Sequence, residues 1–158
     1  MADTKTTSKS TGATGKGSNI WTDEERAAMQ ASARERKATT RQNPADERAE
    51  GEEAVRAKIA DMPEPDRTMA ERLHALVAAS APDLVPRTYY GMPAYAKEGK
   101  VICFFKPASK FKMRYATFEF QPDAALDDGE MWPVSFALTK LTPATEFRIV
   151  ALVKEALS

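Results

Sequence analysis

The sequence predicts an α+β fold in which a small antiparallel sheet of about four strands is flanked by N- and C-terminal helices. Two observations lead to it. Apolar segments of strand length lie between residues 89 and 138, and the first three are joined by short turns, which favours antiparallel pairing. A loop or short helical turn over residues 122–130 leads to the fourth. Segments with the hydrophobic periodicity of helices stand before and after them.

Composition sets further bounds. A chain of 158 residues that is 42% hydrophobic can form one domain with a core. The 23 basic and 23 acidic residues cancel, so no overall field draws the chain towards nucleic acid or a membrane, and we expect neither as a partner. The single cysteine excludes an internal disulfide. Without a signal peptide or a run of about 20 apolar residues, the expected location is the cytoplasm.

The chain divides into three zones. Residues 1–19 are almost all Thr, Ser, Gly, Ala and Lys, with nothing large to bury, so we expect a disordered tail. Residues 20–60 are predicted to form a helical N-terminal extension. Residues 61–158 are predicted to form the α+β domain.

The first predicted helix starts with a capping box, Thr22-Asp23-Glu24-Glu25, and runs to about Lys37. It is rich in Ala, Arg and Glu, and its apolar face holds little beyond Met29. We therefore expect this helix to form but to dock weakly on the rest of the chain.

The second predicted helix starts at an Asn-Pro pair, residues 43–44, and runs to about Ala60. Val55 and Ile59 lie one turn apart and form its inner stripe. Gly51, in the middle of this helix, costs about 1 kcal/mol relative to Ala.

The α+β domain is predicted to begin with a helix capped by Asp66. Four strands follow, over residues 89–96, 101–105, 110–120 and 134–138. The second of these is apolar on both parities, which predicts a central strand covered on both faces. A last helix is capped by Thr142. The buried stripes of the two helices are Met69, Leu73, Leu76 and Val77 in the first, and Ile149, Val150, Val153 and Leu157 in the second.

One motif is more specific than the rest. The run Tyr90-Gly91-Met92-Pro93-Ala94-Tyr95 is followed by a glycine turn and an apolar strand, and together they resemble the YdhG-like domain family, small bacterial α+β proteins largely of unknown function. The resemblance spans residues 59–157. One branch of that family is described as frataxin-like intracellular iron chaperones. The resemblance therefore implies iron as the bound metal and iron–sulfur or haem assembly proteins as partners.

Two acidic clusters are the candidate iron sites. Asp46, Glu50 and Glu53 lie at i, i+4 and i+7 of the second predicted helix, and carboxylates one turn apart are hard oxygen ligands suited to a labile metal. Their plainer interpretation is a solvated helix face whose acids also stabilise the helix dipole. The second cluster is more typical of a turn than of a calcium loop, and it comprises Asp127, Asp128 and Glu130.

The alternative function is binding of an anionic small molecule or an acidic partner protein. Lys110, Lys112 and Arg114 share one parity of the third predicted strand, and Lys106 is close by, so these cations could hold a phosphate or a carboxylate. Their plainer interpretation is the solvated face of an edge strand. An aromatic corner could wall the same pocket, although aromatic residues in strands usually serve packing. Its residues are Tyr90, Met92, Tyr95, Tyr115 and Trp132.

No catalytic motif is present, so we predict a protein that is not an enzyme. The chain has no phosphate loop, nucleotide fingerprint, nucleophile elbow or paired-histidine metal motif. His74 is the only histidine, and its place on a helix flank favours a structural role. Cys103 lies inside an apolar strand, where burial makes a thiol inert.

Overall fold

The computed structural model describes residues 21–39 and 43–158, so the predicted tail lies outside the described residues. The described part has an α+β fold with five strands, one more than expected. No helix in these two ranges combines the length and the apolar character needed to cross a membrane. The elements are α1 (Asp23–Thr39), α2 (Pro44–Ala60), α3 (Asp66–Ser80), β1 (Val85–Tyr89), β2 (Met92–Lys97), β3 (Lys100–Lys106), β4 (Ala116–Phe120), β5 (Ser135–Leu138) and α4 (Pro143–Ala156).

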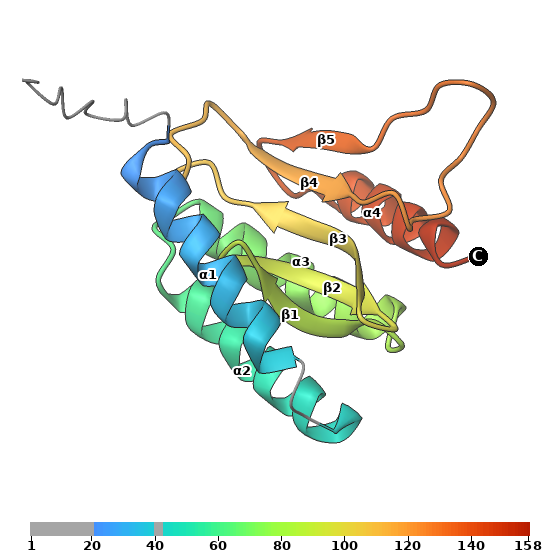
Figure 1. Cartoon of the computed structure of the whole chain (residues 1–158). Helices are drawn as coiled ribbons and strands as arrows, with labels where there is room; N and C mark the ends of the chain where they lie inside the picture. Colours follow the sequence, from blue (N-terminus) through green and yellow to red (C-terminus); the bar gives the residue numbers. More distant parts are fainter. Residues whose placement is uncertain (1–20, 40–42) are drawn as a thin grey trace, which may run out of the picture.

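The five strands form one antiparallel sheet in sequence order, β1-β2-β3-β4-β5 (Figure 1). The prediction of a single strand over residues 89–96 was wrong, because the chain reverses there and β1 pairs with β2. Tyr90 and Gly91 have φ values of 49° and 75°. A left-handed backbone at two successive residues ends one strand and starts the next.

The predicted strand over residues 110–120 was wrong in its first half. Only Ala116–Phe120 pairs with β3, while residues 108–115 form turns and bends. The amide of Met113 donates to the carbonyl of Ala108 at 2.9 Å, and Lys112 has a φ of 53°. Because a stripe of alternating side chains needs an extended backbone, the basic residues of this segment do not share a strand face.

The two faces of the sheet carry separate apolar clusters. Phe105 and Phe118 belong to the main core with side chains from α2, α3 and α4. Phe104 belongs to a smaller cluster on the opposite face with Met92 and Ala94. In Figure 1, α3 and α4 lie behind the sheet and α1 lies in front of its β1–β2 end. The burial of β3 on both faces confirms that it is a covered central strand.

Local capping signals explain where three of the helices begin. Thr22 and Glu25 exchange the two hydrogen bonds of a capping box, at 3.0 and 3.1 Å. Asn43 and Thr142 each accept a hydrogen bond from the backbone amide three residues later. Asp66 is not a cap, contrary to the prediction. It lies inside the first turn of α3, and its buried carboxylate accepts hydrogen bonds from the amide and the hydroxyl of Ser109.

Candidate functional site

Two of the four predicted cations, Lys106 and Lys110, lie beside one aromatic ring rather than along one strand. The ammonium groups of Lys106 and Lys110 lie 4.9 and 5.4 Å from the centroid of Phe111. Together with Lys112 they line a cleft of about 340 Å³. The same cleft is lined by Glu24, whose carboxylate pairs with the Lys112 ammonium at 3.2 Å. The positive charge of this cleft is therefore partly balanced within the protein.

The remaining predicted ligand-binding residues do not form one aromatic corner. Met92 lies in the cluster on one face of the sheet, whereas Tyr95, three residues later in the same strand, lies in the main core on the other. Trp132 packs at the edge of the main core. Arg114 stacks on Tyr115, with its guanidinium 5.0 Å from the ring centroid.

Lys110 also lines a second cleft of about 340 Å³, which we call the lysine cleft. Lys58, from the last turn of α2, stands in the same lining. The apolar walls come from Met62 and Pro63, just after α2, and from Pro107, just after β3. The polar lining includes one carboxylate, that of Asp61. The other lining residues are Gly91 and Ser109.

Lys110 is half-buried and electrostatically disfavoured in its charged form. Its ammonium donates a hydrogen bond to the carbonyl of Tyr90 at 3.1 Å. Burial and the positive charge of Lys58 lower the pKa of Lys110, and the negative charge of Glu35 opposes that change. An anion placed between the two lysines would stabilise the ammonium of Lys110.

The backbone around Lys110 is held on two sides. Asp66 binds the amide of Ser109 at 2.9 Å, which anchors the residue before Lys110 to α3. Gly91 has a φ of 75°, a left-handed conformation that favours glycine, and a Cβ there would require the Lys110 ammonium to move aside. Gly91 therefore belongs both to the turn and to the lining of the cleft.

Glu35 of α1 clamps the turn between β1 and β2. Its two carboxylate oxygens accept hydrogen bonds from the amides of Tyr90 and Gly91, at 3.1 and 3.2 Å. Two adjacent backbone amides of this turn thus hold one carboxylate of the protein itself. Sequence reasoning missed both Glu35 and Lys58, since backbone amides carry no sequence signal and Lys58 approaches Lys110 only through the fold.

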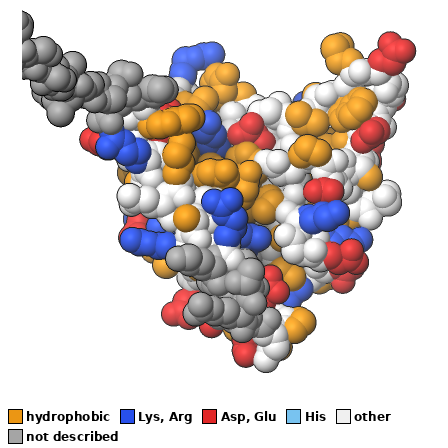
Figure 2. All heavy atoms as spheres, viewed as in Figure 1, with side chains coloured by type: hydrophobic (Ala, Val, Ile, Leu, Met, Phe, Trp, Pro, Cys, Tyr) orange, Lys and Arg blue, Asp and Glu red, His pale blue; other side chains and the backbone are white. Residues whose placement is uncertain are grey.

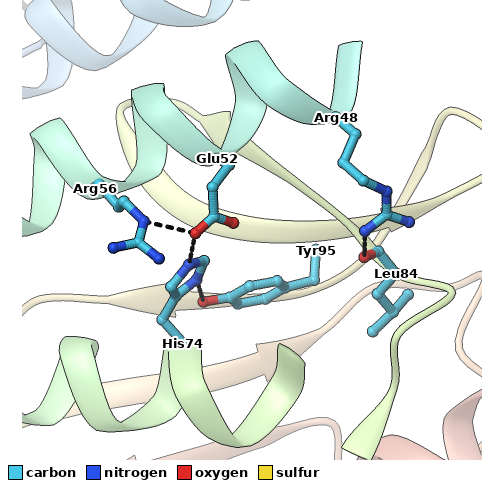
Figure 3. A network of polar contacts seen from close by, with 6 residues as sticks. All are labelled: Arg48, Glu52, Arg56, His74, Leu84 and Tyr95. Atoms are coloured by element: carbon cyan, nitrogen blue, oxygen red, sulfur yellow. Dashed lines mark hydrogen bonds and ion pairs between the residues drawn. The ribbon is translucent and has the colours of Figure 1, made fainter. Parts of the chain in front are cut away.

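A polar network lies between α2, α3 and β2 (Figure 3). Nδ1 of His74 is 3.0 Å from the Tyr95 hydroxyl, and Nε2 is 2.7 Å from Glu52. The same Glu52 oxygen accepts a hydrogen bond from Arg56 at 2.7 Å. The network borders a cleft of about 430 Å³.

The ring of His74 is fully used inside this network. Burial raises the pKa of Tyr95 far above its usual value, so its hydroxyl keeps its proton and can donate to Nδ1. Nε2 then carries the ring proton and donates a hydrogen bond to the Glu52 carboxylate. With both ring nitrogens engaged, His74 joins three elements and has a structural role.

Cys103 is buried in β3, and burial raises the pKa of its thiol far above the usual value. The thiolate that nucleophilic or metal-binding chemistry requires is therefore disfavoured. This agrees with the inert cysteine expected from the sequence.

The acidic clusters lie on the surface. Asp46, Glu50 and Glu53 are exposed on α2, and the carboxylates of the second cluster are exposed in the loop between β4 and β5. Across residues 21–39 and 43–158, no three His, Cys, Asp or Glu side chains come together in a group that could hold a metal ion. Iron binding by either cluster stays a prediction.

Comparisons with protein-family models, with curated proteins and with solved structures gave no match.

Proposed function

We propose that this protein binds a small organic anion, a carboxylate or a phosphate ester, in the lysine cleft and is not an enzyme. The observation that supports this is the pair formed by Lys58 and Lys110. Burial and mutual repulsion disfavour the charge on Lys110. A bound anion would relieve both effects, and perturbed lysines in a cleft are typical of binding sites.

The walls of the cleft indicate the kind of anion. A cleft of about 340 Å³ is at the small end of the range for small-molecule pockets. Met62, Pro63 and Pro107 offer apolar contact, while Asp61 offsets one of the two lysines. A ligand with one anionic group and a short apolar part fits this lining best.

Titration with phenyl phosphate tests the proposal, because this probe joins a dianionic group to a small apolar ring. Lys58→Gln removes one cation from an exposed position without disturbing the core. Lys154→Gln, on the exposed face of α4, is the matched control with the same change in net charge. We expect Lys58→Gln to weaken binding by about five- to tenfold and Lys154→Gln to leave it unchanged.

Two results would contradict the proposal. One is an unaltered protein that shows no binding of phenyl phosphate up to millimolar concentrations in calorimetry. The other is equal affinity of the unaltered protein and Lys58→Gln, which would move any anion site away from the lysine cleft. Inorganic phosphate, titrated in parallel, separates the contribution of the charge from that of the apolar ring.

We propose iron carriage as the second candidate function. It is supported by the resemblance to the YdhG-like family, with its frataxin-like branch, and by the exposure of Asp46, Glu50 and Glu53 on one helix. Surface carboxylates of this kind would bind ferrous ion weakly and release it readily to an assembly protein.

A further inference from the structure

The face of α1 that meets the sheet has small side chains between two carboxylates. Glu24, Ala28, Ser32 and Glu35 lie at i, i+4, i+8 and i+11, and this spacing places them on one side of a helix. Ala28 and Ser32 are each only 5% exposed. Met29, which the sequence suggested as the main apolar contact, is exposed instead. The docking of α1 therefore depends little on large apolar side chains.

Both carboxylates hold segments that carry cleft residues: Glu35 binds Gly91, which lines the lysine cleft, and Glu24 binds Lys112, which lines the neighbouring cleft around Phe111. Glu24 pairs with Lys112, two residues beyond Lys110, and Glu35 binds the amides of Tyr90 and Gly91. Figure 2 shows Lys and Arg side chains standing among hydrophobic ones on this face of the molecule. The helix is thus held by the kind of interaction that an external anion would use.

Gly91 connects the helix to the cleft. It lines the lysine cleft, and its amide binds Glu35. The position of a Cβ on Gly91 would overlap the ammonium of Lys110 and lie 3.8 Å from the Cβ of Ala31 on α1. Lys110 and α1 therefore meet at one glycine, and an anion bound at Lys110 would stand close to the carboxylate of Glu35.

We propose that α1 is a latch on the lysine cleft, fastened by Glu35 and loosened when an anion binds beside Lys110. The proposal rests on the proposed function of that cleft. The bound anion and Glu35 both carry negative charge, so their repulsion disfavours the state in which the anion is bound and α1 is docked at the same time. Coupling of this kind is reciprocal: the docked helix lowers the affinity for the anion, and the anion lowers the stability of the docked helix.

The test uses the full chain and two readouts. Glu35→Gln removes the negative charge but keeps an oxygen that can accept one of the two amide hydrogen bonds. Glu155→Gln, on the exposed face of α4, is the control with the same change in net charge. Affinity is measured by calorimetric titration with phenyl phosphate at low salt, and docking of α1 by hydrogen exchange of the amides in residues 26–39.

We expect Glu35→Gln to bind phenyl phosphate about fivefold more tightly than the unaltered protein, at the lower end of usual coupling. Its α1 amides should exchange faster in the absence of the anion, and saturating phenyl phosphate should speed exchange of α1 in the unaltered protein. Glu155→Gln should match the unaltered protein in both readouts.

The two proposals fail in different ways. If the unaltered protein and Glu35→Gln both fail to bind phenyl phosphate, the function proposed for the cleft is wrong and the latch with it. If both bind with equal affinity and the anion leaves exchange of α1 unchanged, the cleft binds anions but α1 is not its latch.

Discussion

Gly51 of α2 lies directly against the backbone carbonyl of Pro86 in the edge strand β1, and a Cβ at residue 51 would overlap that oxygen. The missing side chain lets α2 pack along β1, where it covers a strand edge that would otherwise be open. The same approach places Val55 and Ile59 in the main core. In the sequence this glycine appears only as a cost to the helix.

Gly51→Ala is expected to lower the free energy of unfolding by about 2–3 kcal/mol, because a backbone carbonyl cannot move aside as a side chain can. Helix propensity alone predicts the opposite, a gain of about 1 kcal/mol. Urea unfolding distinguishes the two. Ala57→Gly, at an exposed position of the same helix, should show the loss from propensity alone. A stabilised Gly51→Ala protein would contradict the close packing of α2 on β1.

The network around His74 should behave as a unit. His74→Phe keeps an aromatic ring but leaves the Tyr95 hydroxyl without its partner and Glu52 without one of its two partners, so we expect a loss of about 2–4 kcal/mol in unfolding experiments. Tyr95→Phe alone should cost about 1–2 kcal/mol. In the His74→Phe background the second substitution should cost clearly less, since the hydroxyl has already lost its bond. Additive losses would show that the two residues act independently.

Glu52 should make the stability of the protein depend on pH in acid. Burial opposes ionisation of this carboxyl, but hydrogen bonds from His74 and Arg56 outweigh it and lower its pKa below the usual 4.5. Because the pKa of Glu52 is lower in the folded than in the unfolded state, ionised Glu52 stabilises the fold at pH values above its unfolded-state pKa. This stabilisation is lost as the pH falls through the folded-state pKa. Glu52→Gln should therefore be less stable than the unaltered protein at pH 7, with a difference that narrows towards pH 3. A constant difference across this range would exclude the contribution.

Helix starts could be predicted from the sequence because a cap is a local interaction. The residues concerned, Thr22, Asn43 and Thr142, satisfy amides within three positions of themselves. The hairpin between β1 and β2 was missed because the two residues of its turn stand between apolar strand formers. Tyr90 has a left-handed φ, whereas the propensity of tyrosine favours an extended strand conformation, so propensity did not indicate a turn at this residue.

The candidate site was predicted only in part. Lys110 was predicted as a ligand-binding cation. Because basic and apolar residues alternate from 110 to 114 as in a strand, however, we predicted it on a strand face, whereas it lies in a turn. Asp66 was read as a cap because an acidic residue commonly stands before a helix, whereas its contact with Ser109 spans 43 positions. Contacts between distant segments depend on the packing of the whole chain.

Phe104 and Phe105 point to opposite faces of the central strand, and their replacement measures how well each face is covered. Phe105→Ala should cost about 3–5 kcal/mol, because the main core cannot collapse around the cavity. Phe104→Ala should cost less, about 2–3 kcal/mol, because its cluster is smaller and lies at the face where α1 docks. Chemical denaturation gives both values. Equal losses would show that the outer face is as firmly packed as the main core.

The iron candidate is tested on the carboxylates of α2. Asp46→Asn, Glu50→Gln and Glu53→Gln, combined in one protein, remove three charges from exposed positions, so the fold should be little affected. If the protein carries iron, anaerobic calorimetry with ferrous ion should show a clear loss of affinity in this triple variant, because hard carboxylate oxygens would supply the ligands.

The matched control for that experiment replaces the second acidic cluster, Asp127, Asp128 and Glu130, by the corresponding amides. It removes the same number of charges from an exposed loop, and affinity for ferrous ion should stay unchanged. Loss of binding in the control alone would move the iron site to the loop between β4 and β5. An unaltered protein that binds no ferrous ion up to millimolar concentrations would exclude iron as its cargo, because even a labile site of exposed carboxylates should be detectable there.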